Sequence, residues 1–303
     1  MQPLVETAET VDNSTVLRAV TPGGHPLITA LWLVGVAAAV LAFAAAMLGV
    51  LAPAAALALA ALVAFVAGTV AYRLRLRRFS ATLVAVEEAL DADDVQRARD
   101  LMAPLLARFH TFPLVQEVAA DVLYAAGDPL SAASLWELAM KQLGATRVAP
   151  RLVAAYAALN RGGDARRVAA LVPNEPLARL ALAWSELAAN GGDREHGAAL
   201  AGELVRDVEH APNATVAAMT AAVAAIADAQ RGDRAGMLAK LEAMRHATPT
   251  QNDAAFLSYL AGVALREAGD IDEARREFSV AVERSSDSIG GALARRERAN
   301  LST

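Results

Sequence analysis

The first strong pattern in the sequence is an apolar run without any charge, from Leu27 to Tyr72. A single helix of these 46 residues would be about 69 Å long at about 1.5 Å per residue, whereas the hydrocarbon core of a bilayer is about 30 Å thick. Pro53 interrupts the run near its middle, because proline breaks or kinks a helix interior. It leaves two segments that are each long enough to cross a bilayer, residues 27–51 and 54–72. The pattern predicts a two-helix transmembrane hairpin over residues 26–78, with its tight turn at Leu51-Ala52-Pro53.

Small residues recur along one side of both predicted spans. Such stripes let helix backbones approach each other closely in lipid. They predict a packing face, which serves either other transmembrane helices or only the two halves of this hairpin. An alanine-rich run also produces such stripes by chance. The candidate membrane helix packing residues are Gly35, Ala38, Ala42, Gly49, Ala61 and Gly68.

A run of arginines directly follows the second apolar segment: Arg73, Arg75, Arg77 and Arg78. Positive residues beside a span stay on the cytoplasmic side and attract anionic headgroups. Two spans then place both termini in the cytoplasm, with residues 1–25 as a flexible N-terminal segment. Two alternatives are a cleaved signal peptide, and a single span with the N-terminus outside and the second apolar segment lying at the interface.

Beyond Phe79 the pattern changes to amphipathic helices separated by short breaks. Breaks with a glycine or an acidic turn recur near Asp93, Gly127, Gly162, Gly192, Gly232 and Gly269. Their spacing, about 30 to 40 residues, is typical of paired-helix repeats. Alanine and leucine supply most apolar residues, and both favour helix over sheet. The pattern predicts a helical-repeat domain over residues 79–303.

The last of these units, Phe256 to Ser285, resembles the tetratricopeptide repeat (TPR) family. Small and large residues match at Gly262, Gly269, Ala274, Phe278 and Ala281. The unit around Gly127 matches through Ala120, Leu123, Ala132, Trp136 and Ala139. Two features depart from the family pattern, since Pro104 should kink its helix and bulky Arg167 falls where a small residue belongs. The resemblance implies an all-α fold, in which an α-solenoid of about six TPR-like helix pairs follows the transmembrane hairpin.

In TPR arrays, the first helix of each pair lines a concave groove that binds peptides or partner helices. The resemblance therefore implies a partner-binding groove in this chain. Tyrosine and arginine are typical anchors at interfaces, although the tyrosines could instead pack between helix pairs. The candidate groove residues are Glu117, Asp121, Tyr124, Tyr156, Asn160, Tyr259 and Arg266.

Composition and charge narrow the classes of function. Residues 79–303 carry a net charge of −7, which would repel phosphate backbones and makes nucleic acid an unexpected partner. The chain has no cysteine and only five scattered histidines, without metal-ligand spacing. The sequence contains no phosphate-binding glycine loop and no nucleophile motif. We expect no catalytic, cofactor-binding or metal-binding residue, and no enzymatic activity.

The sequence thus favours a membrane-anchored helical-repeat adaptor or scaffold. It would sit in the inner (cytoplasmic) membrane of a bacterium, with two spans, and bind partner proteins at the cytoplasmic face. The alternative is an integral accessory subunit of a respiratory, photosynthetic, secretion or division complex, which packs through its transmembrane helices. A third hypothesis is an enzyme or regulator that acts on lipids.

Overall fold

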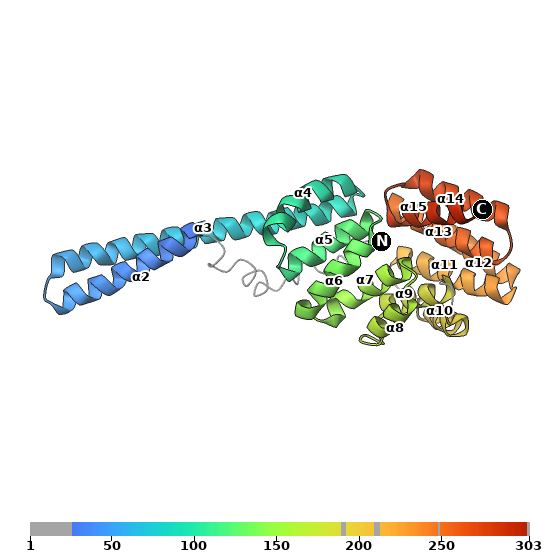
Figure 1. Cartoon of the computed structure of the whole chain (residues 1–303), viewed down its shortest axis with the longest axis horizontal. Coiled ribbons are helices and arrows are strands. Elements are labelled where there is room, and N and C mark those ends of the chain that lie inside the picture. Colours follow the sequence, from blue (N-terminus) through green and yellow to red (C-terminus); the bar gives the residue numbers. More distant parts are fainter. Residues whose placement is uncertain (1–25, 189–191, 209–212, 248, 302–303) are drawn as a thin grey trace. The chain divides into compact units, whose positions relative to one another are not determined.

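The computed structural model describes residues 26–188, 192–208, 213–247 and 249–301, and every element within these ranges is a helix. The predicted N-terminal segment, residues 1–25, lies outside them. The chain divides into two compact units. We call residues 26–84 the hairpin unit and residues 85–301 the array unit. The predicted all-α fold is confirmed, because two long apolar helices packed as a pair precede a series of TPR-like helix pairs (Figure 1).

The hairpin unit consists of α2 (Pro26–Met47) and most of α3 (Leu51–Asp91). The turn between them lies at residues 48–50 and contains Gly49 with a φ of +77°. The turn predicted at Leu51-Ala52-Pro53 is therefore wrong by about three residues. Pro53 lies in the first turn of α3, where proline is tolerated because the N–H groups there have no partner within the helix.

Small residues line the inside of the hairpin. Ala38, Ala42 and Ala61 are buried, and a Cβ on Gly35 would lie only 3.4 Å from the carbonyl oxygen of Ala61. A Cβ on Gly68 would lie 2.5 Å from Cδ1 of Trp32. The structure places five of the six candidate packing residues between α2 and α3, and the sixth, Gly49, in the turn. These five residues pack the hairpin on itself.

The array unit begins with the last turns of α3 and continues through twelve further helices of the described chain. Their bounds are α4 (Val95–Phe109), α5 (Pro113–Ala125), α6 (Pro129–Leu143), α7 (Ala145–Ala158), α8 (Gly162–Ala169), α9 (Pro176–Ala188), α10 (Arg194–Val208), α11 (Ala214–Arg231), α12 (Arg234–Arg245), α13 (Gln251–Glu267), α14 (Ile271–Arg284) and α15 (Ile289–Asn300).

Neighbouring helices of the array pack as pairs: α5 with α6, α7 with α8, α9 with α10, α11 with α12, and α13 with α14. Helix α4 packs on α5 ahead of these pairs, and α15 packs on α13 and α14 after them. The last pair shows the small-to-large contact typical of TPR helices. A Cβ on Gly262 of α13 would lie 2.5 Å from the ring of Phe278 of α14, so only glycine leaves room for this ring.

Helix α3 and the first helices of four of the five pairs are each followed by a residue with a left-handed backbone. These residues are Asp93, Gly127, Asn160, Gly232 and Gly269, with φ between +57° and +83°. The left-handed conformation lets the next N–H groups bond the last carbonyls of the helix, and glycine, asparagine and aspartate tolerate it best. The residues five, nine and twelve positions later are buried in every case. They are Ala98, Met102 and Leu105; Ala132, Trp136 and Ala139; Ala165, Ala169 and Val172; Met237, Leu241 and Met244; and Ala274, Phe278 and Ala281.

This common register corrects the prediction for the pair α7 and α8. The turn was predicted at Gly162, but the left-handed residue is Asn160, and Gly162 is the first residue of α8. With the turn two residues earlier, Ala165 takes the small buried position and Arg167 lies on the surface, with 71% of its side chain exposed. The pair α7 and α8 is therefore a regular repeat, and Arg167 does not occupy its small buried position.

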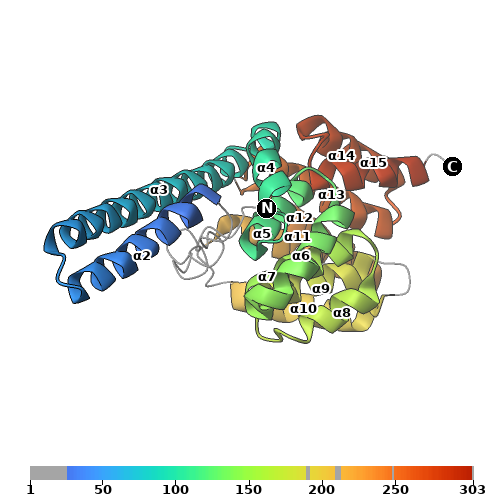
Figure 2. The same ribbon diagram turned by 60° about the vertical axis from the view of Figure 1, so that its left-hand side comes forward.

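The array curls until its last helices meet its first turns. The carboxylate of Asp93 accepts hydrogen bonds from the backbone N–H groups of Gln251 and Asn252, at 2.7 and 3.4 Å. The guanidinium of Arg296 in α15 donates to the carbonyl of Ala158 at the end of α7, at 3.2 Å. Gly127 approaches α15 so closely that a Cβ there would lie 3.0 Å from the Cβ of Ala292. Helices α13 and α15 therefore cover the edge formed by the first three turns (Figure 2).

Candidate interaction surfaces

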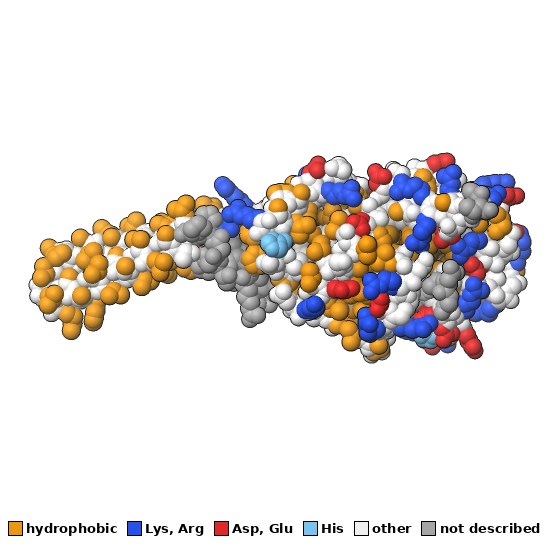
Figure 3. Space-filling model, in the orientation of Figure 1, with side chains coloured by type: hydrophobic (Ala, Val, Ile, Leu, Met, Phe, Trp, Pro, Cys, Tyr) orange, Lys and Arg blue, Asp and Glu red, His pale blue; other side chains and the backbone are white. Residues whose placement is uncertain are grey.

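The outer surface of the hairpin unit is made of large apolar side chains (Figure 3). The described chain contains two helices long and apolar enough to cross a membrane. Only 11% of an apolar 18-residue stretch of each helix is buried. The exposed residues include Leu33, Val36, Val40, Leu41, Phe43, Met47, Leu51, Leu59, Leu62, Val63, Phe65, Val66 and Val70. A contiguous exposed apolar surface of this size is typical of a membrane or protein contact.

The hairpin reverses the arrangement of a water-soluble helix pair. In water, large apolar side chains face the partner helix, because their burial provides about 25 cal/mol per Å². Here alanine and glycine face inward, while leucine, valine and phenylalanine face outward. Lipid tails remove the drive to bury large side chains, and close backbone approach then determines the packing. The sequence signalled this arrangement through its stripes of small residues.

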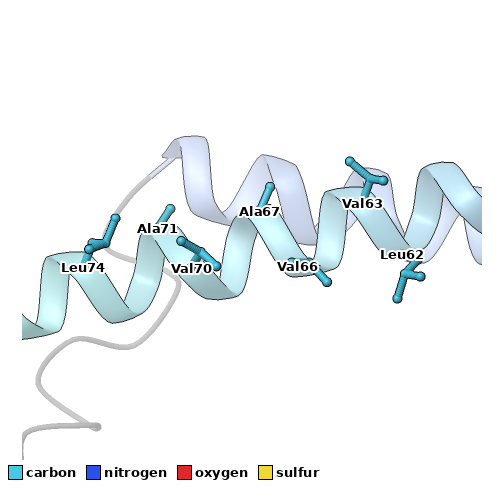
Figure 4. Close-up of a pocket in the computed structure, with 7 residues that line it drawn as sticks. All are labelled: Leu62, Val63, Val66, Ala67, Val70, Ala71 and Leu74. Carbon is cyan, nitrogen blue, oxygen red and sulfur yellow. The ribbon is translucent and has the colours of Figure 1, made fainter.

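A shallow apolar groove runs along the outer side of α3 (Figure 4). It is lined by Leu62, Val63, Val66, Ala67, Val70, Ala71 and Leu74. All seven side chains come from α3 itself, so the groove lies along one helix and contains no polar side chain. Sequence reasoning did not single out this surface, although the larger residues recur there at helical spacing.

The arginine run continues α3 beyond its apolar part. Arg73, Arg77 and Arg78 are exposed, and Arg75 is partly buried. Arg73 and Arg77 are four residues apart and therefore lie on the same side of the helix. The next acidic residue along the chain is Glu87. The apolar surface of the hairpin thus ends at a group of positive side chains.

The three tyrosines predicted to line a groove are buried in the core of the array. The ring of Tyr124 lies 5.5 Å from that of Trp136, and Tyr156 donates its hydroxyl hydrogen to Glu137. Tyr259 packs against the rings of Trp184, Phe256 and Phe278, with centroids 5.9 to 6.2 Å apart. Tyr156 and Tyr259 contact a neighbouring pair, through α6 and α9, which is the alternative role that the sequence left open, whereas the ring contact of Tyr124 lies within the pair α5 and α6.

The two predicted acids of α5 belong to a cluster of charges. Glu117 is buried and accepts hydrogen bonds from Arg147, at 2.9 Å, and from Arg151, at 2.6 Å. Asp121 lies 3.5 Å from Nε of Arg151, and 14% of its side chain is exposed. Burial raises the pKa of Asp121 to about 7, against the opposing effect of Arg151. Burial and the neighbouring carboxylates raise the pKa of Glu87 at the end of α3.

The remaining two groove candidates lie apart from this cluster. Asn160 is exposed at the turn after α7, where its backbone is left-handed. Arg266 is partly buried near the end of α13 and pairs with Glu297 of α15 and with Glu267. The seven candidate residues therefore do not form one open groove in this conformation. Four of the seven are buried, Asp121 and Arg266 are partly buried, and Asn160 is exposed.

Sequence reasoning missed Arg147 and Arg151, the partners of the two acids. Both pairs of residues are spaced four apart on their helices, Glu117 with Asp121 and Arg147 with Arg151. This spacing places each pair on one helix face, and it could have signalled an ion-pair network between α5 and α7. Within the described ranges, no group of three or more histidines, aspartates or glutamates could hold a metal ion.

The fold defines a class: an all-helical protein with an apolar helix pair followed by TPR-like pairs. No family model matches the chain, and no curated protein matches it. Among solved structures, one match is the crystal structure of the P58(IPK) TPR domain, which is 11% identical with a TM-score of 0.34, over 82% of this chain and 74% of that chain. This likeness is too distant to assign a family, and the TPR-like description rests on the turns and contacts given above.

Proposed function

We propose that this protein is a non-enzymatic adaptor that anchors a helical-repeat array to a membrane through its two apolar helices. The reversed hairpin is the observation that carries the proposal. Small residues inside and large apolar residues outside are expected of a helix pair in lipid and are unfavourable in water. The arginines after the second span favour an array on the cytoplasmic side, which in a bacterium is the inner face of the inner membrane.

The array supports the binding of a protein partner. TPR-like pairs present long helical surfaces, and tethering raises the local concentration of any partner near the membrane. Two leucines of α6, Leu130 and Leu138, are exposed on one side of their helix and offer an apolar contact on the outer face. The predicted groove residues stay a second candidate for partner binding, with four of the seven buried in this structure.

An integral accessory subunit of a multi-subunit membrane complex is the second candidate. Its helices would pack against other spans, and the exposed groove of α3 supports this possibility. The small residues favour the adaptor, because they are already used inside the hairpin. Close packing against further helices would have to proceed through large side chains.

The two candidates differ in where a partner attaches. The test is crosslinking in intact membranes, with a photoreactive residue at Leu138 in the array or at Val66 in the hairpin. The adaptor predicts a defined protein crosslinked from Leu138, and the accessory subunit predicts one crosslinked from Val66. Arg167 on α8 serves as a control position on the array surface. Extraction of the protein from membranes by alkaline carbonate would contradict both candidates.

A further inference from the structure

We propose that one side of α3 binds an anionic phospholipid, with an acyl chain in the apolar groove and the headgroup phosphate on the arginines beyond it. This inference rests on the proposed insertion of the hairpin into a membrane. It adds a specific ligand class, and a site for it, to a hairpin that would otherwise only anchor the chain.

The groove and the arginines lie along a continuous helical face. Val63, Val66 and Val70 line the groove, and the same spacing of three to four residues leads through Leu74 to Arg77 and Arg78. Residues at this spacing form one side of an α-helix. A lipid that follows this face therefore passes from apolar side chains directly to cationic ones.

The length of the groove fits one leaflet. From Leu62 to Leu74 the helix rises by about 18 Å, at about 1.5 Å per residue. Half of a hydrocarbon core of about 30 Å is about 15 Å. An acyl chain lying along the groove would reach the headgroup region close to Arg73 and Arg77, where a phosphate is found in a bilayer.

Arg73, Arg77 and Arg78 carry charge that no carboxylate of the described residues neutralises. Among these residues, no carboxylate lies within 4.0 Å of Arg73, Arg77 or Arg78, whereas Arg147 and Arg151 in the array both pair with Glu117. The run has no acidic neighbour along the helix before Glu87. Three cations beside an apolar groove complement a ligand that combines an acyl chain with a negative phosphate, and an arginine guanidinium can bind phosphate through two hydrogen bonds.

The experiment titrates the purified full-length protein, in a mild detergent, with phosphatidylglycerol or phosphatidylcholine and counts bound lipids by native mass spectrometry. We expect phosphatidylglycerol to bind at least about fivefold more tightly than phosphatidylcholine. The triple variant R73Q/R77Q/R78Q should lose this preference. The control R99Q/R108Q/R206Q removes the same charge from exposed arginines of the array and should keep it. Circular dichroism checks that each variant is folded.

Two further measurements distinguish lipid binding in the groove from the binding of a free anion by the arginines. Ala67→Leu narrows the groove and should weaken the binding of both lipids while the charge preference remains. Inorganic phosphate should not displace phosphatidylglycerol at equal concentration, and complete displacement would indicate a site for free anions. Equal binding of both lipids by the unmodified protein, or a preference that survives in the triple variant, would overturn the inference. A protein that stays in carbonate-washed membranes without lipid preference would contradict only this inference and leave the proposed function standing.

Discussion

Asp121 lies where three helices bring like charges together. It shares its surroundings with Glu117 on the same helix, with Glu87 at the end of α3, and with Arg147 and Arg151 on α7. Three carboxylates therefore face two guanidinium groups. The network stores a proton most easily at Asp121, because burial raises its pKa to about 7, far above an ordinary aspartate at about 3.9.

This shift predicts how stability depends on pH. Between about pH 4 and 7 the folded state binds more protons at Asp121 than the unfolded state does, so stability falls as the pH rises through this window. Asp121→Asn removes the titrating group. We expect the variant to be more stable than the unmodified protein at pH 8, by on the order of 1–2 kcal/mol, and to show a flatter pH dependence.

The measurement is the midpoint of thermal unfolding, followed by circular dichroism in detergent at pH 5, 6, 7 and 8. Asp207→Asn is the control, because Asp207 is exposed and pairs only at the surface with Arg179. The control should follow the curve of the unmodified protein. An Asp121→Asn protein with the unchanged slope would show that another group is responsible.

At the scale of single elements, much of the array could be predicted from the sequence. Repeated Gly-Asp pairs mark the turns at Gly127, Gly232 and Gly269, because glycine ends one helix and the following aspartate begins the next. Asp128 and Asp233 indeed accept hydrogen bonds from backbone N–H groups three residues later. The turn at Asn160 was not predicted, because asparagine adopts the left-handed conformation less often than glycine and Gly162 lies only two residues further on.

The corrected register of α8 makes a paired prediction. Ala165 occupies the fully buried small position, whereas Arg167 is exposed. Ala165→Leu should destabilise the array by about 1–3 kcal/mol, because a larger side chain does not fit a packed site. Arg167→Leu should change stability by no more than about 0.5 kcal/mol. Thermal unfolding of both full-length variants in detergent tests the register. A larger loss of stability in Arg167→Leu than in Ala165→Leu would support a turn at Gly162 instead.

The hairpin was predictable for a simpler reason. A run without charge that is twice as long as a bilayer is thick permits few alternatives to two helices. Its turn was misplaced because Pro53 was read as the break, although proline also fits the first turn of a helix. Gly49, whose backbone conformation actually reverses the chain, lies four residues earlier.

The closure of the array could not be predicted from the sequence at the scale of the whole molecule. Periodicity reports contacts between neighbouring helices, whereas the meeting of the first and last helices depends on small rotations added over all pairs. The contact between Asp93 and the start of α13 joins residues 158 positions apart. No local pattern indicates it. The groove implied by an open TPR array therefore differs from the closed core that buries Tyr124, Tyr156 and Tyr259.

Asp93 offers a test of this closure. Asp93→Gly keeps the left-handed turn but removes the carboxylate that receives the N–H groups of Gln251 and Asn252. We expect faster hydrogen exchange at the first turn of α13 and a loss of about 1 kcal/mol of stability, as for other lost helix caps. Asp93→Asn retains an oxygen acceptor and is the matched control. Exchange in α13 that is the same in Asp93→Gly as in the unmodified protein would show that this contact does not hold the ends together.

The contact between the two ends of the array also sets an order of events during synthesis. The hairpin unit is synthesised before the array unit, and if it inserts into a membrane as proposed, its large exposed apolar side chains require a bilayer before the array is complete. The pairs that follow can form one after another, each on its predecessor. The contact between the two ends of the array can form only when α13 and α15 have been made, so the array closes after all of its pairs have been synthesised and well after the hairpin unit.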